Sequence, residues 1–201
     1  MSTTDFPRTP QLAPRDGAGL RFYAVYGWAI LGVSLLLVNA LVRLAPIAWE
    51  PIADGSLGGM EWAVLAGWVA FNAYCEGYRG FQKAFCPRVT ARAFHVARGG
   101  SALHAALAPA FCMSLFHASR RGLIASWTLL AGIVTLVIIV RGLSQPWRGI
   151  IDAGVVVGLG WGVVALWVIA LRSLVSGPPR VKMNLPEPEP NAAAEARGFA
   201  R

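Results

Sequence analysis

The sequence has few charged residues, and long stretches of it have none. Asp, Glu, Lys and Arg make up only 14% of its 201 residues, whereas a soluble domain carries about 25%. Hydrophobic residues make up 56%, and the mean hydropathy is +0.53. This composition excludes an ordinary soluble domain and predicts an all-α fold, a polytopic bundle of transmembrane helices.

The sequence also lacks the motifs of common enzymes and cofactor sites. Its three cysteines form no CxxC pair and make an odd number, so no disulfide framework is indicated. It contains no GxSxG elbow, no HExxH pair and no P-loop. We therefore expect no catalytic residue, no metal and no resident cofactor.

Five apolar segments lie between two polar tails. The expected spans cover about residues 22–42, 57–75, 102–117, 123–140 and 153–171. A helix of about 20 apolar residues is long enough to cross roughly 30 Å of hydrocarbon. The tails, residues 1–21 and 176–201, contain several prolines and are predicted to be disordered.

Whether segment 102–117 crosses decides the topology. If it crosses and the N-terminus is cytoplasmic, the Lys and Arg residues divide into 10 inside and 8 outside; if it only dips into the membrane, they divide into 15 and 3. The positive-inside rule favours the second arrangement, with four spans, while apolar length favours the first, with five. Both arrangements place the N-terminal tail and the loop over 75–100 in the cytoplasm.

The net charge of +8 would suggest nucleic acid as a partner in a soluble protein. Here the basic residues flank apolar segments, so the positive-inside rule explains the charge and we expect no nucleic-acid partner. Arginine outnumbers lysine 16 to 2, and alanine and glycine are abundant. We interpret this bias as that of a GC-rich genome, which predicts a bacterial inner-membrane protein.

Polar residues recur at helical spacing at the end of the second segment and after it. Four of them follow at intervals of four, three and four, which places them on one helical face: Asn72, Glu76, Arg79 and Lys83. Pro87 is expected to end that helix, and a second amphipathic helix should follow it. We expect interfacial helices over 76–98 that present a basic platform to anionic lipids or to an acidic partner surface. This basic platform consists of Glu76, Arg79, Lys83, Arg88 and Arg92.

Two further hypotheses concern this stretch. Glu76 and Arg79 could instead form an ion pair that sets the conformation of a binding site. The run Tyr74-Cys-Glu-Gly-Tyr-Arg-Gly-Phe-Gln82 resembles uncharacterised multi-pass bacterial membrane proteins. That resemblance covers the central part of the chain and implies no activity and no catalytic residue.

The fifth segment carries Gly154, Gly158 and Gly162 at intervals of four. Small residues at this spacing let a second helix approach closely. The glycines predict a packing groove, used either within the bundle or at a subunit interface of a homo- or hetero-oligomer.

Two histidines of segment 102–117, His104 and His117, lie thirteen residues apart, a spacing like that of haem-binding membrane helices. One such helix supplies half of the axial ligands, so haem binding would need a second subunit. The simpler interpretation places His117 at the membrane interface and lets His104 hydrogen-bond to a neighbouring helix.

The pattern as a whole favours a non-catalytic accessory or assembly subunit. It would act through helix packing and the basic platform. One alternative is a small transporter or channel that oligomerises around Asn39, Asn72 and scattered Ser and Thr residues. A second alternative is a lipid-modifying enzyme that uses Glu76, Arg79 or the histidines. Both are disfavoured because the span centres hold almost no ionisable groups.

Overall fold

A computed structural model describes residues 16–99, 101–116, 118–181 and 183. Over these residues the fold is entirely helical and contains no strand, as the composition predicts. The elements in chain order are α1 (Asp16–Ala53), α2 (Gly59–Asn72), η1 (Ala73–Phe85), α3 (Cys86–Gly99), α4 (Ala102–Ala106), α5 (Ala108–Cys112), α6 (Arg120–Arg141) and α7 (Trp147–Ser176).

Three of these helices are long and apolar enough to cross a membrane. They are α1 over Gly19–Ala53, α6 over Gly122–Arg141 and α7 over its full length. The first, fourth and fifth expected spans lie within these helices. The chain is therefore a membrane protein with transmembrane helices.

The second expected span belongs to a longer helical run, because α2, η1 and α3 follow one another without a break. The prediction that Pro87 ends the helix is wrong. η1 is a π-helix, and the N–H of Cys86 still donates to the carbonyl of Phe81, five residues earlier. The change from π- to α-helical hydrogen bonding leaves Pro87 in the first turn of α3, where a missing N–H is tolerated.

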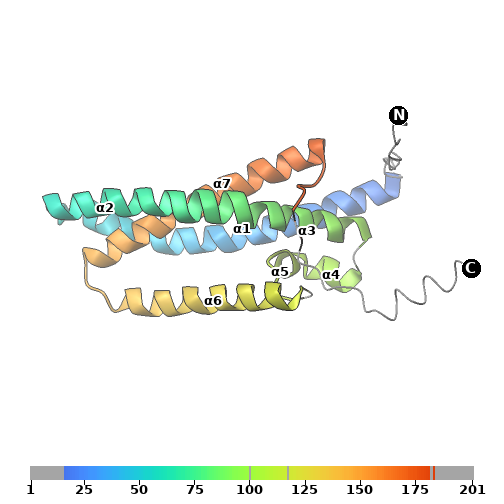
Figure 1. Cartoon of the computed structure of the whole chain (residues 1–201). Helices are drawn as coiled ribbons and strands as arrows, with labels where there is room; N and C mark the ends of the chain where they lie inside the picture. Colours follow the sequence, from blue (N-terminus) through green and yellow to red (C-terminus); the bar gives the residue numbers. More distant parts are fainter. Residues whose placement is uncertain (1–15, 100, 117, 182, 184–201) are drawn as a thin grey trace, which may run out of the picture.

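α1 and the continuous run of α2, η1 and α3 pack against α7 (Figure 1). α1 runs antiparallel to α7, since the Tyr26 hydroxyl donates to the carbonyl of Ala170 at 2.9 Å while Gln145 Nε2 donates to the carbonyl of Ile47 at 3.3 Å. α2, η1 and α3 run parallel to α7. The connections over 54–58 and 142–146 therefore lie at one end of the bundle, and α4 and α5 lie at the other.

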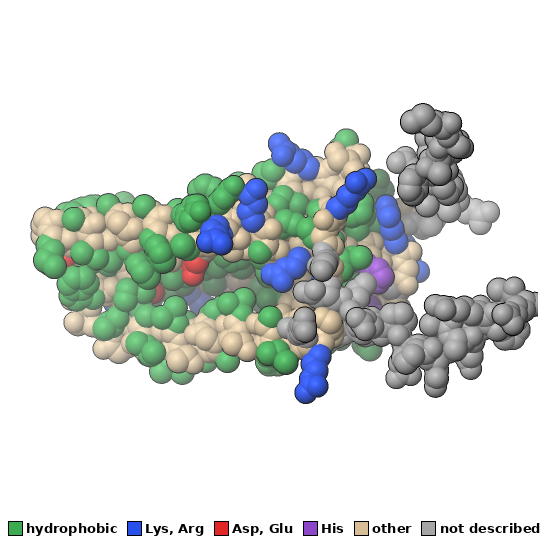
Figure 2. All heavy atoms as spheres, viewed as in Figure 1, with side chains coloured by type: hydrophobic (Ala, Val, Ile, Leu, Met, Phe, Trp, Pro, Cys, Tyr) green, Lys and Arg blue, Asp and Glu red, His purple; other side chains and the backbone are tan. Residues whose placement is uncertain are grey.

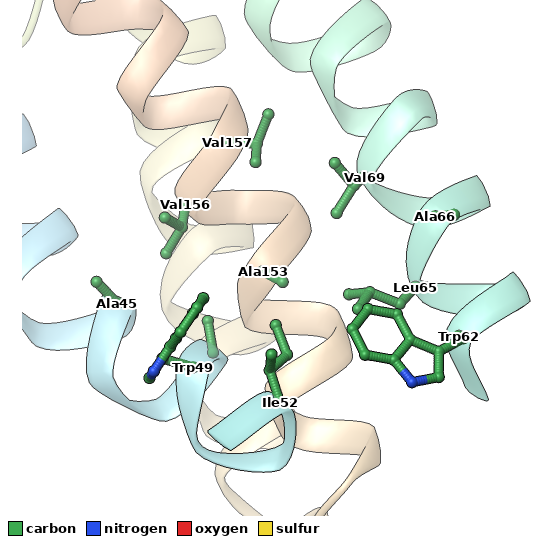
Figure 3. Close-up of a pocket in the computed structure, with 11 residues that line it drawn as sticks. Ala45, Trp49, Ile52, Trp62, Leu65, Ala66, Val69, Ala153, Val156 and Val157 are labelled. Carbon is green, nitrogen blue, oxygen red and sulfur yellow. The ribbon is translucent and has the colours of Figure 1, made fainter. Parts of the chain in front are cut away.

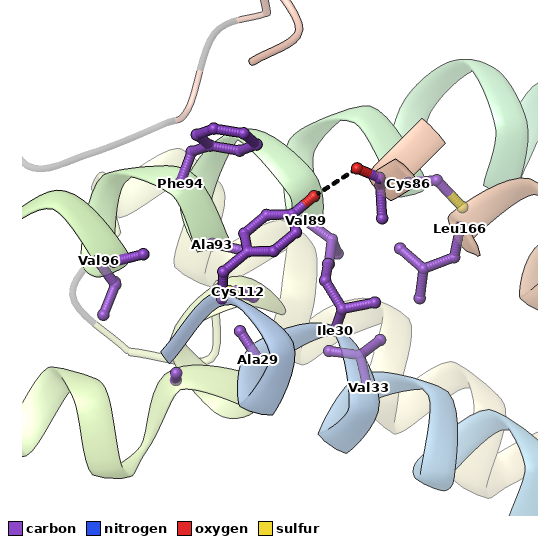
Figure 4. Close-up of a cluster of buried hydrophobic side chains, with 14 of the residues drawn as sticks. Ala29, Ile30, Val33, Cys86, Val89, Ala93, Phe94, Val96, Cys112 and Leu166 are labelled. Atoms are coloured by element: carbon purple, nitrogen blue, oxygen red, sulfur yellow. Dashed lines mark hydrogen bonds between the residues drawn. The ribbon is translucent and has the colours of Figure 1, made fainter. Parts of the chain in front are cut away.

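The main hydrophobic core joins α1, α3, α5 and α7 at the end of the bundle that holds α4 and α5. Figure 4 shows Ile30 and Val33 of α1 facing Val89 of α3 and Leu166 of α7. Because Tyr26 is itself buried in this cluster, its hydrogen bond to α7 is shielded from water.

Residues 102–112 of the third expected segment do not form one helix. α4 and α5 have five residues each and so rise about 7.5 Å, far less than the roughly 30 Å of a bilayer core. Pro109 lies in the first turn of α5 and packs against Gly32 of α1. The described part of this segment therefore contains no helix of spanning length, and α4 and α5 pack against α3 and α1.

The tails are described only in part. α1 begins at Asp16, so the predicted N-terminal disorder is wrong for residues 16–21. Residues 1–15, 182 and 184–201 lie outside the described residues, and so does His117.

Candidate functional site

The three glycines of α7 form a seam against which α2 and η1 pack. A Cβ atom on Gly154 would lie 2.5 Å from Nε1 of Trp68, and one on Gly158 would lie 2.6 Å from Oε2 of Glu76. A Cβ on Gly162 would lie 2.6 Å from the ring of Phe81. Only glycine permits this approach. The groove expected from the spacing is therefore occupied within the chain, which leaves no room for a second subunit there.

The seam is reciprocal at the level of η1. The indole of Trp161 packs against Gly77 of η1. Its Cγ would lie 2.9 Å from a Cβ atom at position 77. The Nε1 of Trp161 donates to Oε1 of Gln82 at 2.8 Å. A polar contact thus fixes the register of η1 along α7.

The polar face expected on this helix divides between two environments. Asn72 is only 4% exposed and donates to the carbonyl of Trp68 at 2.9 Å. Glu76 is half-buried against Gly158, whereas Arg79 is exposed. Glu76 and Arg79 do not form the hypothesised ion pair, since no contact within 4.0 Å joins their charged groups. Glu76 therefore belongs to the helix interface.

Three basic residues of the expected platform remain accessible. Arg79 and Lys83 are exposed and Arg88 is partly exposed. The Lys83 Nζ lies 5.3 Å from the ring centroid of Tyr78, and Arg88 Nε donates to the carbonyl of Ala84 at 2.9 Å. On the face shown in Figure 2, most Lys and Arg side chains gather over the half of the molecule that holds α3. On this face the basic side chains therefore lie toward the end of the bundle that holds α3.

Arg92 does not belong to the exposed platform, and its placement there is wrong. Its side chain is 0% exposed. Nε donates to the carbonyl of Phe111 at 2.7 Å, Nη1 to that of Met183 at 2.7 Å and Nη2 to that of Phe116 at 3.5 Å. The guanidinium carbon also lies 4.1 Å from the centroid of the Phe111 ring. Arg92 thus joins α3 to α5 and to the segment that follows α7.

The surroundings of Arg92 explain how a charge is kept in the interior. Burial lowers the pKa of the guanidinium, but carbonyl oxygens and an aromatic face both favour the charged form. Burial raises the pKa of the neighbouring Cys112 thiol to about 12, although Arg92 opposes this shift. Cys112 is therefore a thiol at neutral pH and is not activated as a nucleophile.

Sequence reasoning missed the position of Arg92 because helical spacing aligned it with Arg88. The available signal was its flanking pair of alanines, Ala91 and Ala93, in a run of small and apolar residues. Small neighbours let other segments come close enough for their carbonyls to reach the guanidinium.

His95 and His104 both lie near α5. The ring centroids of His95 and His104 lie 6.4 Å and 5.2 Å from that of Phe111, and His104 Nδ1 lies 2.9 Å from the Ser101 hydroxyl. No group of three or more His, Cys, Asp and Glu among the described residues could hold a metal ion. His104 lies on the short helix α4, so the haem-like spacing with His117 is not carried by one membrane-spanning helix.

The polar residues expected to line a pore do not face one another. Asn39 is exposed on α1, whereas Asn72 is buried against α7.

No family model matches the chain, and neither a curated protein nor a solved structure does. Its function has to be inferred from the residues and their geometry.

Proposed function

We propose that the chain is a non-catalytic accessory or assembly subunit of a membrane complex, and that α6 is the helix that binds its partner. The observation that carries this proposal is the exposure of α6. Only 6% of its most apolar 18-residue window is buried, against 33% for α7. Within the chain, α6 is held near its ends, where Ser126 Oγ donates to the carbonyl of Met113 and Val140 is buried.

The exposed surface of α6 has a face suited to another helix. Four small residues recur at intervals of three, four and three: Ala125, Thr128, Gly132 and Thr135. Small residues let helix backbones approach closely, and threonine hydroxyls can hydrogen-bond across a helix pair in lipid. A Cβ on Gly132 would meet no atom of this chain within 4 Å. We therefore place a partner transmembrane helix on this face.

A pair of matched substitutions tests the interface. Gly132→Leu adds a large side chain to the small-residue face, and Val134→Leu adds one methylene group to the opposite, equally exposed side. Mild-detergent affinity purification followed by mass spectrometry should show partner chains lost with Gly132→Leu and kept with Val134→Leu. Equal recovery of the same chains with both variants would show that this face contacts only lipid.

The proposal includes a topology of four spans, formed by α1, by residues 57–75 in α2 and the start of η1, by α6 and by α7. The end with α4 and α5 would be cytoplasmic, because the four-span count places 15 basic residues there and 3 at the other end. In a Cys75→Ser background, Gly99→Cys should be protected from an impermeant thiol reagent in intact cells and Ser144→Cys should be labelled. The reverse pattern would overturn the orientation.

In this orientation the exposed residues of the basic platform would face anionic lipids. Arg79, Lys83 and Arg88 would lie beside the cytoplasmic leaflet of a bacterial inner membrane and attract anionic lipids. Arg79→Gln with Lys83→Gln should reduce the enrichment of phosphatidylglycerol around the purified protein, and the wild-type enrichment should fall as salt rises. Salt-independent enrichment in both proteins would contradict the electrostatic role.

A further inference from the structure

Glu76 is an ionisable residue on a stretch of the bundle that is otherwise apolar. Its carboxylate lies over Gly158 of α7, where Oε2 would come 2.6 Å from a Cβ atom. Gly158 follows the first residue of α7, Trp147, by eleven positions and precedes the last, Ser176, by eighteen. At 1.5 Å per residue these separations are about 16 Å and about 27 Å. The carboxyl group therefore lies along the part of α7 that would cross hydrocarbon.

The side chains next to this position offer nothing to a charge. Figure 3 shows Val69 of α2 and Val157 of α7 across from each other, in a groove of about 560 Å³ between α1, α2 and α7. Every side chain that lines the groove is Ala, Val, Leu, Ile or Trp. Val157 is adjacent to Gly158, and Val69 lies seven positions before Glu76. A carboxylate beside such walls gains no compensating hydrogen bond from them.

Glu76 also lacks a counter-charge. Within the part of the chain that the structure describes, its carboxyl group makes no hydrogen bond and no ion pair. In η1, Arg79 and Lys83 are exposed, and Lys83 lies over the ring of Tyr78. η1 packs against α2, α3 and α7. The charged and histidine residues of those helices lie at least six positions from Glu76 or from Gly158: Glu61, Arg88, Arg92, His95, Arg98, Arg148, Asp152 and Arg172.

A buried hydrogen-bond acceptor lies four positions before Glu76. Asn72 is only 4% exposed, and its Nδ2 donates to the carbonyl of Trp68 at 2.9 Å. Its Oδ1 accepts no hydrogen bond from any described residue. Residues four apart on a helix are neighbours, so this oxygen and the carboxyl group share one face. A protonated carboxyl group has an O–H that can donate to Oδ1, whereas a carboxylate has acceptors only.

We propose that Glu76 is a proton-binding site within the membrane. In the packed seam its carboxyl group is neutral, and the hydroxyl donates to Oδ1 of Asn72. The ionised form is unfavourable there, because neither hydrocarbon nor the neighbouring residues supply a donor or a counter-charge. Release of the proton to water requires the carboxylate to reach water, which separates η1 from α7 at Gly158. The site is separate from the face of α6 and does not depend on any partner protein.

The first test labels the purified full-length chain in nanodiscs with dicyclohexylcarbodiimide. This apolar reagent adds to carboxyl groups that carry a proton, and mass spectrometry locates the adduct. Glu50 is the internal control, because its carboxylate is exposed and accepts a hydrogen bond from Gln145. As pH is raised, labelling of Glu76 should persist to a pH at least about one unit higher than that of Glu50, which corresponds to a tenfold tighter hold on the proton. Loss of both labels at the same pH would overturn the site.

The second test asks whether the proton controls packing. If the folded state holds the proton more tightly than the unfolded chain does, the unfolding temperature in detergent should fall as pH rises. Glu76→Gln keeps the size and a donor for Asn72 but cannot ionise, so it should remove most of that fall, whereas Glu50→Gln should keep it. An equal fall in the wild type and in Glu76→Gln would overturn the coupling.

Asn72→Leu tests the acceptor, because it removes Oδ1 and keeps a side chain of similar size. Labelling of Glu76 in this variant should end at a lower pH than in the wild type, while that of Glu50 should not change. An unchanged pH dependence at Glu76 would overturn the hydrogen bond to Asn72.

Discussion

α6 and α7 are adjacent in the sequence and almost equally apolar, yet they are packed very differently. Their mean hydropathies over 18 residues are 2.5 and 2.3, and residues 142–146 connect them. About a third of the apolar window of α7 is buried, whereas almost none of that of α6 is. Hydropathy measures the preference of a segment for lipid over water, and it does not report whether protein or lipid covers the segment.

The difference follows from the placement of small residues. In α7 three glycines in one line meet Trp68, Glu76 and Phe81 across the seam. In α6 the space above Gly132 is open. Packing in lipid depends on close contact, so a helix that finds complementary side chains joins the bundle and one that does not remains at its edge.

The largest expected effect concerns Arg92, which joins α3 to α5 and to the segment that follows α7. Arg92→Met keeps an unbranched side chain of similar length but removes the donors to Phe111, Phe116 and Met183. We expect a loss of about 3 kcal/mol in unfolding free energy, because buried carbonyls lose bonds to a charged group. Hydrogen exchange should also rise over residues 108–126, while α7 stays protected.

Arg88→Met is the matched control for that change. Its Nε bond to Ala84 lies within the same helix at an exposed position, so we expect a loss below about 0.5 kcal/mol. Equal loss of stability in the two variants would contradict the structural role assigned to Arg92.

The second effect tests the seam itself. Gly158→Leu would drive its side chain into Glu76, whereas a Cβ on Gly160 of the same helix meets nothing within 4 Å. Overpacking costs about 1–3 kcal/mol, so Gly158→Leu should lower the unfolding temperature in detergent clearly and Gly160→Leu hardly at all. Similar unfolding temperatures for the two variants would show that α7 is packed no more tightly than α6.

A smaller effect is expected at the other end of α7. Tyr26→Phe removes one buried hydrogen bond to Ala170 and keeps the ring that packs against Phe94. The loss should be about 1 kcal/mol, measured by chemical unfolding in detergent. An unchanged unfolding free energy would mean that this bond does not hold α1 to α7.

The smallest effect is expected on α6. In the isolated chain, Gly132→Leu should change the unfolding free energy by less than about 0.5 kcal/mol, because the added side chain meets no neighbour. The same variant is expected to abolish partner recovery, so stability and assembly are separable at this position. A large loss of stability in the purified chain would show instead that α6 packs within its own bundle.

The basic platform shows where sequence reasoning was sufficient and where it failed. Helical spacing placed Arg79 and Lys83 on an accessible surface, and both are exposed. The same reasoning placed Arg92 beside them, because a single helix gives no information about carbonyls brought from α5 and from the segment after α7. The prediction that Pro87 ends the helix failed for a related reason. The effect of a proline on a helix depends on the hydrogen-bonding pattern of the turn before it, which is π-helical here.

The sequence by itself determined that this is a membrane protein of helices and located three apolar segments that lie within helices of spanning length. Those properties depend on the length and hydropathy of contiguous residues, which local sequence contains in full. Only the tertiary structure decided that residues 102–112 form two short helices, that Arg92 is interior, and that the seam of α7 is packed against α2 and η1 while most of α6 is exposed. These properties depend on contacts between residues far apart in the chain, and such contacts exist only once the helices have packed.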